Sequence, residues 1–376
     1  MSRKHTPRRL PAPFGVDDCI RHIIDDVMRI GDLDVGAGCP CFVIAEAGSN
    51  HDGRLAQAKS LIDVAAAAGA SAVKFQTFKA RHMYPRSAGS VEYLKELGIR
   101  DSIYDLVEGL EMPDEWIPEL AGHCAERGIL FLSTPFDEAS ADLLEPYVPA
   151  FKIASYELTH LPLIRHVARK GKPLLLSTGG GQMPEIAEAI AAARAEGNDR
   201  IVVLQCTAKY PAPLDVIDVR ALDMMRNELG VPVGLSDHSA EPLAASLAAV
   251  AREACVIEKH FTLSRSLPGP DHSFALEPGE LREMIRLVRE VERALGEREK
   301  RVRDVERELV DYRRSIFTTR PVALGEPFGP HNIAVLRRAG LPDPGLAPSA
   351  FDQLFGKQAA RALGADHLVA RSDIRS

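Results

Sequence analysis

The chain has 376 residues, of which 45% are hydrophobic and 26% are charged, and its formal net charge is −7. This composition is typical of a globular protein with a large core, and its acidic balance argues against a general attraction to nucleic acid. We find no apolar run long enough for a membrane span or a signal peptide, so we expect a cytoplasmic protein with no membrane partner. The six cysteines lack C-x-x-C spacing, which favours reduced thiols.

Residues 20–30 have apolar positions at helical spacing and precede a glycine-rich turn. From residue 42 onward, short apolar runs alternate with longer helix-like segments, as expected for a parallel sheet covered by helices. The runs that predict strands are residues 42–45, 72–75, 129–132, 150–153, 174–176, 201–204, 233–235 and 255–257. Helices are predicted between them, among them residues 55–68, 113–127, 161–170, 184–195 and 242–251.

Eight consecutive strand–helix units predict an α/β fold, a (β/α)8 TIM barrel, in which functional side chains gather at the C-terminal ends of the strands. Because successive residues of a strand face opposite sides, we expect Asp237 and Lys259 to point away from this group. The polar side chains at the predicted strand ends are Glu46, Lys74, Gln76, Thr134, Lys152, Ser155, Ser177, Lys209, Tyr210, Ser236, His238, Glu258 and His260.

These residue types suit two kinds of chemistry. Two lysines, several hydroxyls and the glycine-rich turn at residues 178–181 predict a receptor for a phosphate-bearing substrate. Two strand-end imidazoles, His238 and His260, with a carboxylate nearby suit a divalent transition ion that keeps positions open for substrate. A desolvated lysine would also suit a Schiff-base aldolase, which the residues alone leave as an alternative.

Eight short motifs, in this order, resemble those of the sialic acid synthase family, which includes the N-acetylneuraminate synthases and their legionaminic and pseudaminic acid relatives. The resemblance extends from about residue 42 to near the C-terminus. The motifs are Ile-Ala-Glu-Ala-Gly-Ser-Asn-His-Asp-Gly (44–53), Lys-Phe-Gln (74–76), Ser-Thr-Pro-Phe (133–136), Lys-Ile-Ala-Ser (152–155), Ser-Thr-Gly (177–179), Tyr-Pro (210–211), Gly-Leu-Ser-Asp-His (234–238) and Glu-Lys-His-Phe (258–261).

The resemblance implies that phosphoenolpyruvate condenses with an N-acylated hexosamine, such as N-acetylmannosamine or a di-N-acetylated relative. The products are a nine-carbon 2-keto sugar acid and phosphate. It also implies a divalent metal, most often Mn²⁺ with Mg²⁺ or Co²⁺ as alternatives, and His238 and His260 match its protein ligands.

The resemblance assigns roles to further residues of this chain. Glu46 and Gln76 match contacts to the sugar, with Glu46 in proton transfer, and both belong to the expected catalytic set with Lys74 and Lys152. Asp271, in a Pro-Gly-Pro-Asp-His-Ser loop, matches a residue that binds the sugar. The residues matched to phosphoenolpyruvate are Lys74, Thr134, Lys152, Ser155, Ser177 and Ser236, and Tyr210 is expected as a further substrate contact.

The C-terminal part resembles the small, mostly-β antifreeze-like (SAF, β-clip) domain of the family. It implies a homodimer in which this domain caps the partner's barrel and supplies an arginine to the sugar site. Arg338 is the expected match and Arg337 the alternative, because the loop after them is longer than in the family pattern. The expected divisions are an N-terminal extension (1–38), the barrel (39–295), a charged linker (296–314) and the SAF domain (315–376).

Three questions stay open at the level of sequence. Another phosphoenolpyruvate-dependent 2-keto sugar acid synthase would share this chemistry but would need a second phosphate site. A non-catalytic barrel that binds a sugar or an ice-like surface belongs to a different class. Lys209 departs from many relatives, and its ammonium either strengthens phosphoenolpyruvate binding or projects into solvent.

Overall fold

The computed structural model describes residues 27–89, 102–341 and 343–375. The chain divides into two compact units, Met1–Gly296 and Glu297–Ser376, which are described separately. None of the helices within these described stretches is long and apolar enough to cross a membrane.

The first unit is a parallel eight-stranded barrel, which confirms the predicted fold class. The hydrogen-bonded order is β5-β4-β3-β10-β9-β8-β7-β6. The first barrel strand along the chain, β3, therefore pairs with the last one, β10. The consecutive strands β5 and β6 form the two edges of the sheet and pack against each other, which nearly closes the barrel. The strands are β3 (Phe42–Gly48), β4 (Ala72–Thr77), β5 (Leu130–Pro135), β6 (Phe151–Ile153), β7 (Leu174–Ser177), β8 (Ile201–Cys206), β9 (Val233–Asp237) and β10 (Val256–His260).

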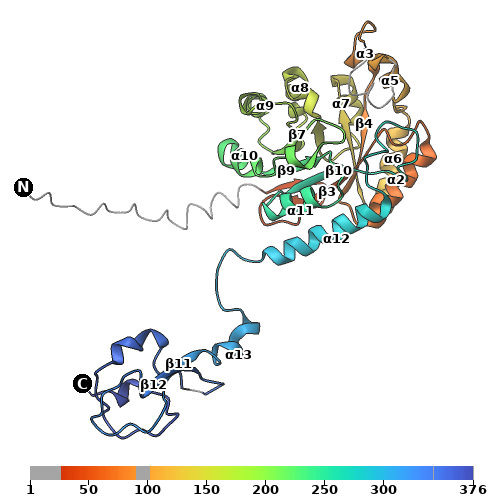
Figure 1. The fold of residues 1–376 in the computed structure, drawn as a ribbon. Coiled ribbons are helices and arrows are strands. Elements are labelled where there is room, and N and C mark those ends of the chain that lie inside the picture. Colours follow the sequence, from red (N-terminus) through yellow and green to blue (C-terminus); the bar gives the residue numbers. More distant parts are fainter. Residues whose placement is uncertain (1–26, 90–101, 342, 376) are drawn as a thin grey trace, which may run out of the picture. The chain divides into compact units, whose positions relative to one another are not determined.

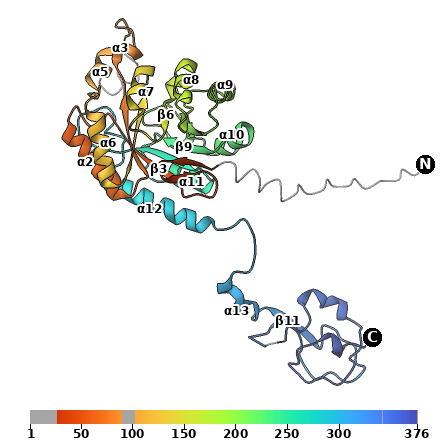
Figure 2. The ribbon, with the colours of Figure 1, turned by 180° about the vertical axis from the view of Figure 1, so that it is seen from behind.

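Helices surround the strands, with α2, α6 and α12 side by side on one flank and α8, α9 and α10 on the other (Figures 1 and 2). The helices predicted between the barrel strands are all present. They form because each carries an apolar stripe that the sheet covers, and several end at a left-handed glycine, as α2 does at Gly69 with φ of 83°. The α-helices among the described residues of this unit are α2 (Leu55–Ala68), α3 (Ala80–Met83), α5 (Ile103–Gly109), α6 (Trp116–Arg127), α7 (Glu138–Leu144), α8 (Leu161–Arg169), α9 (Met183–Ala195), α10 (Ala221–Leu229), α11 (Ala244–Ala251) and α12 (Pro278–Leu295).

A short hairpin closes the N-terminal end of the barrel. Strands β1 (Met28–Ile30) and β2 (Leu33–Val35) pair antiparallel, and their buried side chains join the apolar cluster that contains Phe42 and Ile44. The helical interpretation of residues 20–30 is therefore wrong for its last part, and residues 20–26 lie outside the described residues. Because the base is filled with apolar side chains, the interior is accessible for chemistry only from the opposite end.

Strand alternation divides the barrel interior into an apolar layer and a polar layer. On β3, Phe42 and Ile44 belong to the apolar cluster, and the next residue with the same orientation is Glu46. On β10, Val256 belongs to the same cluster and Glu258 follows two residues later. The polar layer therefore lies at the C-terminal ends of the strands.

The second unit has its own small core. It contains the one-turn helix α13 (Arg307–Val310) and the antiparallel ribbon β11 (Arg314–Thr318) and β12 (Ile333–Arg337). Isolated bridges such as Val322↔Leu363 fold the remaining chain over Ile316, Phe328 and Ile333. Short 3-10 turns complete the unit: η3 (Asp304–Glu306), η4 (Pro348–Ala350), η5 (Asp352–Leu354) and η6 (Arg371–Asp373).

Candidate active site

A polar pocket lies at the C-terminal ends of the barrel strands. Of the residues predicted for the site, all except Asp271 and Arg338 line it, together with Phe136, Ala154 and Glu258. The predicted residues that line it are Glu46, Lys74, Gln76, Thr134, Lys152, Ser155, Ser177, Tyr210, Ser236, His238 and His260.

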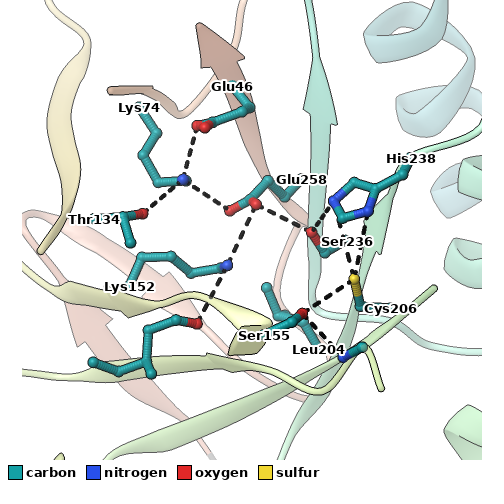
Figure 3. Close-up of polar contacts among 12 residues, drawn as sticks. Glu46, Lys74, Thr134, Lys152, Ser155, Leu204, Cys206, Ser236, His238 and Glu258 are labelled. Carbon is teal, nitrogen blue, oxygen red and sulfur yellow. Dashed lines mark hydrogen bonds and ion pairs between the residues drawn. The ribbon is translucent and has the colours of Figure 1, made fainter. Parts of the chain in front are cut away.

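Two buried lysines face two buried carboxylates in this pocket (Figure 3). Lys74 Nζ lies 2.8 Å from Glu46 Oε2 and donates to Thr134 Oγ1 at 2.8 Å. Lys152 Nζ lies 3.4 Å from Glu258 Oε1, and Lys74 Nζ lies 3.9 Å from Glu258 Oε2. Glu258 thus connects both ammonium groups.

Burial and charge act on these groups in opposite directions. Burial raises the pKa of Glu46 to about 7, although Lys74 opposes this shift. Burial also raises the pKa of Glu258, but Lys152 and Lys74 together bring it below its usual value. The pKa of Lys152 is lowered, because burial outweighs the attraction of Glu258. The pKa of Lys74 is raised, because Glu258 and Glu46 together outweigh burial. The site holds one carboxylate that stays charged and one that can carry a proton near neutral pH.

The sequence placed Glu258 among the polar side chains at the strand ends but assigned it no role in the site. It precedes His260 by two residues on β10 and so faces the same side, and Ser236 Oγ on β9 donates to its Oε1 at 3.1 Å. Glu157, in η1 (Ser155–Glu157) after β6, does not line the pocket, but the charge of Lys152 acts on its carboxyl group. Its Oε2 atom is buried without a hydrogen-bond partner among the described residues, and burial raises its pKa to about 7.

The glycine-rich turn after β7 packs against the strand ends rather than presenting a row of free amides. Gly179 N–H donates to Ser155 Oγ at 3.0 Å, and Thr178 Oγ1 donates to the carbonyl of Leu204. A Cβ on Gly179 would lie 2.8 Å from the Cβ of Ala208, so only glycine fits this approach. Ser177 Oγ remains buried without a hydrogen-bond partner among the described residues.

The two histidines lie on adjacent strand ends with ring centroids 5.5 Å apart. His238 Nδ1 lies 3.0 Å from the carbonyl of Thr207, which can only accept, so this nitrogen carries a proton. Its Nε2 lies 3.3 Å from the Tyr210 hydroxyl and 3.4 Å from Ser236 Oγ. Tyr210 stacks on the His238 ring at 4.1 Å. His260 Nδ1 is buried without a hydrogen-bond partner in the described part of the chain, and burial lowers the pKa of this imidazole well below its usual value.

This pair fits a divalent ion that takes only two ligands from the protein. The fit rests on the unpaired nitrogen of His260 and the oriented ring of His238, because metal-bound imidazoles are neutral and are held by a second hydrogen bond. Within residues 27–89, 102–341 and 343–375, no group of three or more His, Cys, Asp or Glu side chains could hold a metal. A bound ion would therefore keep positions for substrate and water.

Asp271 lies at the side of the pocket near Gly48. A Cβ on Gly48, whose φ is +52°, would lie 3.3 Å from Asp271 Oδ2 and 3.4 Å from both Gln76 Nε2 and Glu46 Oε1. Gln76 Nε2 donates to Glu46 Oε1 at 2.9 Å, and Asp271 Oδ2 lies 3.9 Å from His260 Nδ1. Burial raises the pKa of Asp271 to about 6. Because Gly48 has no side chain, these three polar groups come close together around it, and we call the group of Glu46, Gln76 and Asp271 side chains the Gly48 subsite.

Lys209 does not line the pocket, and the two arginines belong to the second unit. Lys209 is exposed and lines a neighbouring cavity of about 440 Å³ with Met183 and Met224, so the solvent alternative is favoured. Arg338 is 7% exposed, and its guanidinium donates to the carbonyls of Leu341, Asp343 and Val310 within its own unit. Arg337 is exposed and has no side-chain hydrogen bond or ion pair with the described residues. Of the two arginines, Arg337 is the one whose guanidinium is available.

An eight-stranded parallel barrel with a buried polar pocket at the C-terminal strand ends defines the class of TIM-barrel proteins, whose functional sites lie at that end. Residues 61–300 match the model of the NeuB family, and residues 313–375 match the SAF domain. Spore coat polysaccharide biosynthesis protein SpsE of Bacillus subtilis is 45% identical over 363 residues, which cover 92% of this chain and 96% of SpsE. The chain belongs to the NeuB family, as the resemblance of its motifs implied.

Two further relatives carry names that describe an activity. N,N'-diacetyllegionaminic acid synthase of Campylobacter jejuni is 38% identical over 87% of this chain and 98% of its own length. A crystal structure of N-acetylneuraminic acid (sialic acid) synthetase from Leptospira borgpetersenii, in complex with citrate, is similar with a TM-score of 0.69. Its identity is 30%, and the match covers 76% of this chain and 95% of that one.

Proposed function

We propose that the protein condenses phosphoenolpyruvate with an N-acylated hexosamine to give a nine-carbon 2-keto sugar acid and phosphate. The observation that carries the proposal is the buried pair Lys74 and Lys152 beside the open imidazoles His238 and His260. The names of the legionaminic acid and sialic acid relatives support the same reaction class. Lys74 and Lys152 are only 2% and 3% exposed. Burying two ammonium groups is costly, so their place in the pocket favours a role in binding an anion over a role at a solvated surface.

The lysine end of the pocket would hold phosphoenolpyruvate. Lys74 and Lys152 supply positive charge, and the hydroxyls of Thr134, Ser155, Ser177 and Ser236 supply donors for phosphate and carboxylate oxygens. The unpaired hydroxyl of Ser177 is such a donor. Glu46 can carry a proton near pH 7, so of the two pocket carboxylates only Glu258 needs to keep its negative charge. This reduces the repulsion of the trianionic phosphoenolpyruvate.

The Gly48 subsite would hold the acceptor sugar. Gln76 offers an amide, and Asp271 offers a carboxylate that accepts hydrogen bonds from sugar hydroxyls. Glu46 belongs to this subsite and also contacts Lys74, so it is placed to move a proton between the two reactants. Tyr210, stacked on His238, would form an apolar wall beside the reacting atoms.

We assign His238 and His260 as the ligands of a divalent ion, with Mn²⁺ preferred over Mg²⁺ or Co²⁺. Bound there, such an ion supplies Lewis-acid polarisation of the acceptor's carbonyl group. Carbon C3 of phosphoenolpyruvate then forms a bond to the aldehyde carbon, whose oxygen takes a proton. Water adds at C2, and cleavage of the C2–O bond releases phosphate.

We further propose a cytoplasmic homodimer in which the SAF domain, residues 315–376 after the linker 296–314, caps the barrel (residues 39–295) of the partner. In this arrangement Arg337 would reach the sugar of the partner subunit, because the Arg338 guanidinium is held by three carbonyls of its own unit. Size measurement in solution tests the dimer.

The direct test of the function is phosphate release from phosphoenolpyruvate with Mn²⁺ and a panel of N-acylated and di-N-acylated hexoses. We expect release with at least one of these acceptors, and no release without an acceptor. A sugar phosphate in the panel, such as a pentose phosphate, tests the other class of phosphoenolpyruvate-dependent synthase. Absence of release with every N-acylated acceptor would overturn the proposal.

A further inference from the structure

A fully buried histidine next to Asp271 connects two distant loops. His272 is 0% exposed, and its Nε2 lies 2.9 Å from Asp52 Oδ1, whereas its Nδ1 lies 2.6 Å from Thr262 Oγ1. Asp52 belongs to the loop after β3 and His272 to the loop after β10, 220 residues further along the chain. The histidine therefore joins the two segments that flank the Gly48 subsite.

The Asp52 carboxylate is itself held in place. Gln57 Nε2 donates to its Oδ2 at 2.6 Å, and the Asp52 backbone adopts a left-handed φ of 48°. Burial raises the pKa of Asp52, but hydrogen bonds from His272 and Gln57 lower it below its usual value, so the carboxylate is ionised at neutral pH. An ionised carboxylate only accepts, so His272 Nε2 carries a proton and donates it.

The loop before Asp271 packs directly on this hydrogen bond. A Cβ on Gly269 would lie 2.8 Å from both Asp52 Oδ1 and His272 Cδ2, so the loop backbone approaches the pair as closely as glycine allows. With His272 anchored on one side and Gly269 on the other, the two residues between them have little freedom. One of these is Asp271, whose carboxylate is part of the Gly48 subsite.

We propose that His272, anchored by Asp52, is a positioning residue that orients the Asp271 carboxylate toward the hydroxyl groups of the acceptor sugar. This inference rests on the proposed function and deepens it by assigning acceptor selection to the Asp52–His272–Thr262 chain. Phosphoenolpyruvate binding is independent of this chain, because Lys74 and Lys152 lie on β4 and β6.

The test compares steady-state constants for both substrates in His272→Leu, His272→Gln and wild type. His272→Leu removes both ring nitrogens, and we expect the KM for the acceptor to rise at least about 10-fold while the KM for phosphoenolpyruvate stays within about 2-fold. His272→Gln keeps an N–H donor for Asp52, and we expect it to restore most of the acceptor affinity. Asp52→Asn weakens the anchor and should give an intermediate KM.

His123→Leu is the matched control. His123 also bonds an aspartate, with Nε2 2.8 Å from Asp63 Oδ1, but on helices α6 and α2 outside the barrel. We expect it to lower the melting temperature without moving either KM. An unchanged acceptor KM in His272→Leu overturns the inference. If His272→Leu does not fold, an unchanged acceptor KM in Asp52→Asn overturns it instead. Wild-type protein that turns over no acceptor overturns the proposed function and this inference with it.

Discussion

A buried ion pair on the outer face of the barrel gives a sharp test of how the site is held. Asp237 and Lys259 alternate with the site residues on β9 and β10 and point away from the pocket, as expected from the sequence. Both are 1% exposed, and Lys259 Nζ lies 2.8 Å from Asp237 Oδ2. The same ammonium donates to the carbonyls of Ser239 and Glu241 at 2.7 and 2.9 Å, which fixes the loop after His238.

Lys259→Met removes this ammonium and leaves the Asp237 carboxylate buried. Its remaining partners are the backbone amide of Ser239 and the hydroxyl of Ser246, which do not neutralise the charge. Breaking one side of a buried pair costs about 3–5 kcal/mol. The double variant Asp237→Asn/Lys259→Met removes the stranded charge, so we expect it to recover part of the loss.

The assay is urea unfolding followed by tryptophan fluorescence. The chain has one tryptophan, Trp116 on α6, so this signal reports the barrel unit. With an m value of roughly 3 kcal/mol/M, the Lys259→Met midpoint should fall by roughly 1–1.7 M. Lys59→Met, which removes the exposed Lys59–Glu119 pair, is the control and should cost less than about 1 kcal/mol. Equal losses in Lys259→Met and Lys59→Met would refute the reasoning.

Three further predictions concern the site. Because the pKa of Glu46 is raised to about 7, folding is favoured at low pH and this contribution to stability is lost as pH rises from about 4.5 to 7. We expect kcat/KM to fall through pH 7, since the protonated Glu46 that admits the trianion and can donate a proton is lost; Glu46→Gln should abolish this pH dependence, and Glu157→Gln should keep it. His238→Ala, His260→Ala or a chelator should abolish turnover with unchanged tryptophan fluorescence, and full activity in chelator would exclude a metal role. Arg337→Ala should raise the acceptor KM and leave the melting temperature unchanged. Arg338→Ala should instead destabilise the second unit, because it removes three hydrogen bonds to carbonyls. The reverse pattern would assign the sugar contact to Arg338.

The order of strands and helices could be read from the sequence because their signals are local. A period of two places alternate residues of β9 and β10 on one face, so the common orientation of Ser236, His238 and His260 follows from spacing alone. The same rule predicts that Glu258, two residues before His260 on β10, faces the pocket. The apolar runs also predicted a parallel barrel, whose active face lies at the C-terminal strand ends.

Only the tertiary structure decided which partners these side chains have. The raised pKa of Glu46 comes from full burial, which outweighs the opposing charge of Lys74. The hydrogen bond of His272 joins residues 220 positions apart, and the direction of the Arg338 side chain depends on carbonyls that include that of Val310. The hairpin at residues 28–35 becomes strand because the barrel base offers it an apolar surface, which overrides its helical spacing. Local spacing determines which face a residue occupies, whereas charge, protonation and orientation depend on contacts that form only when distant segments pack together.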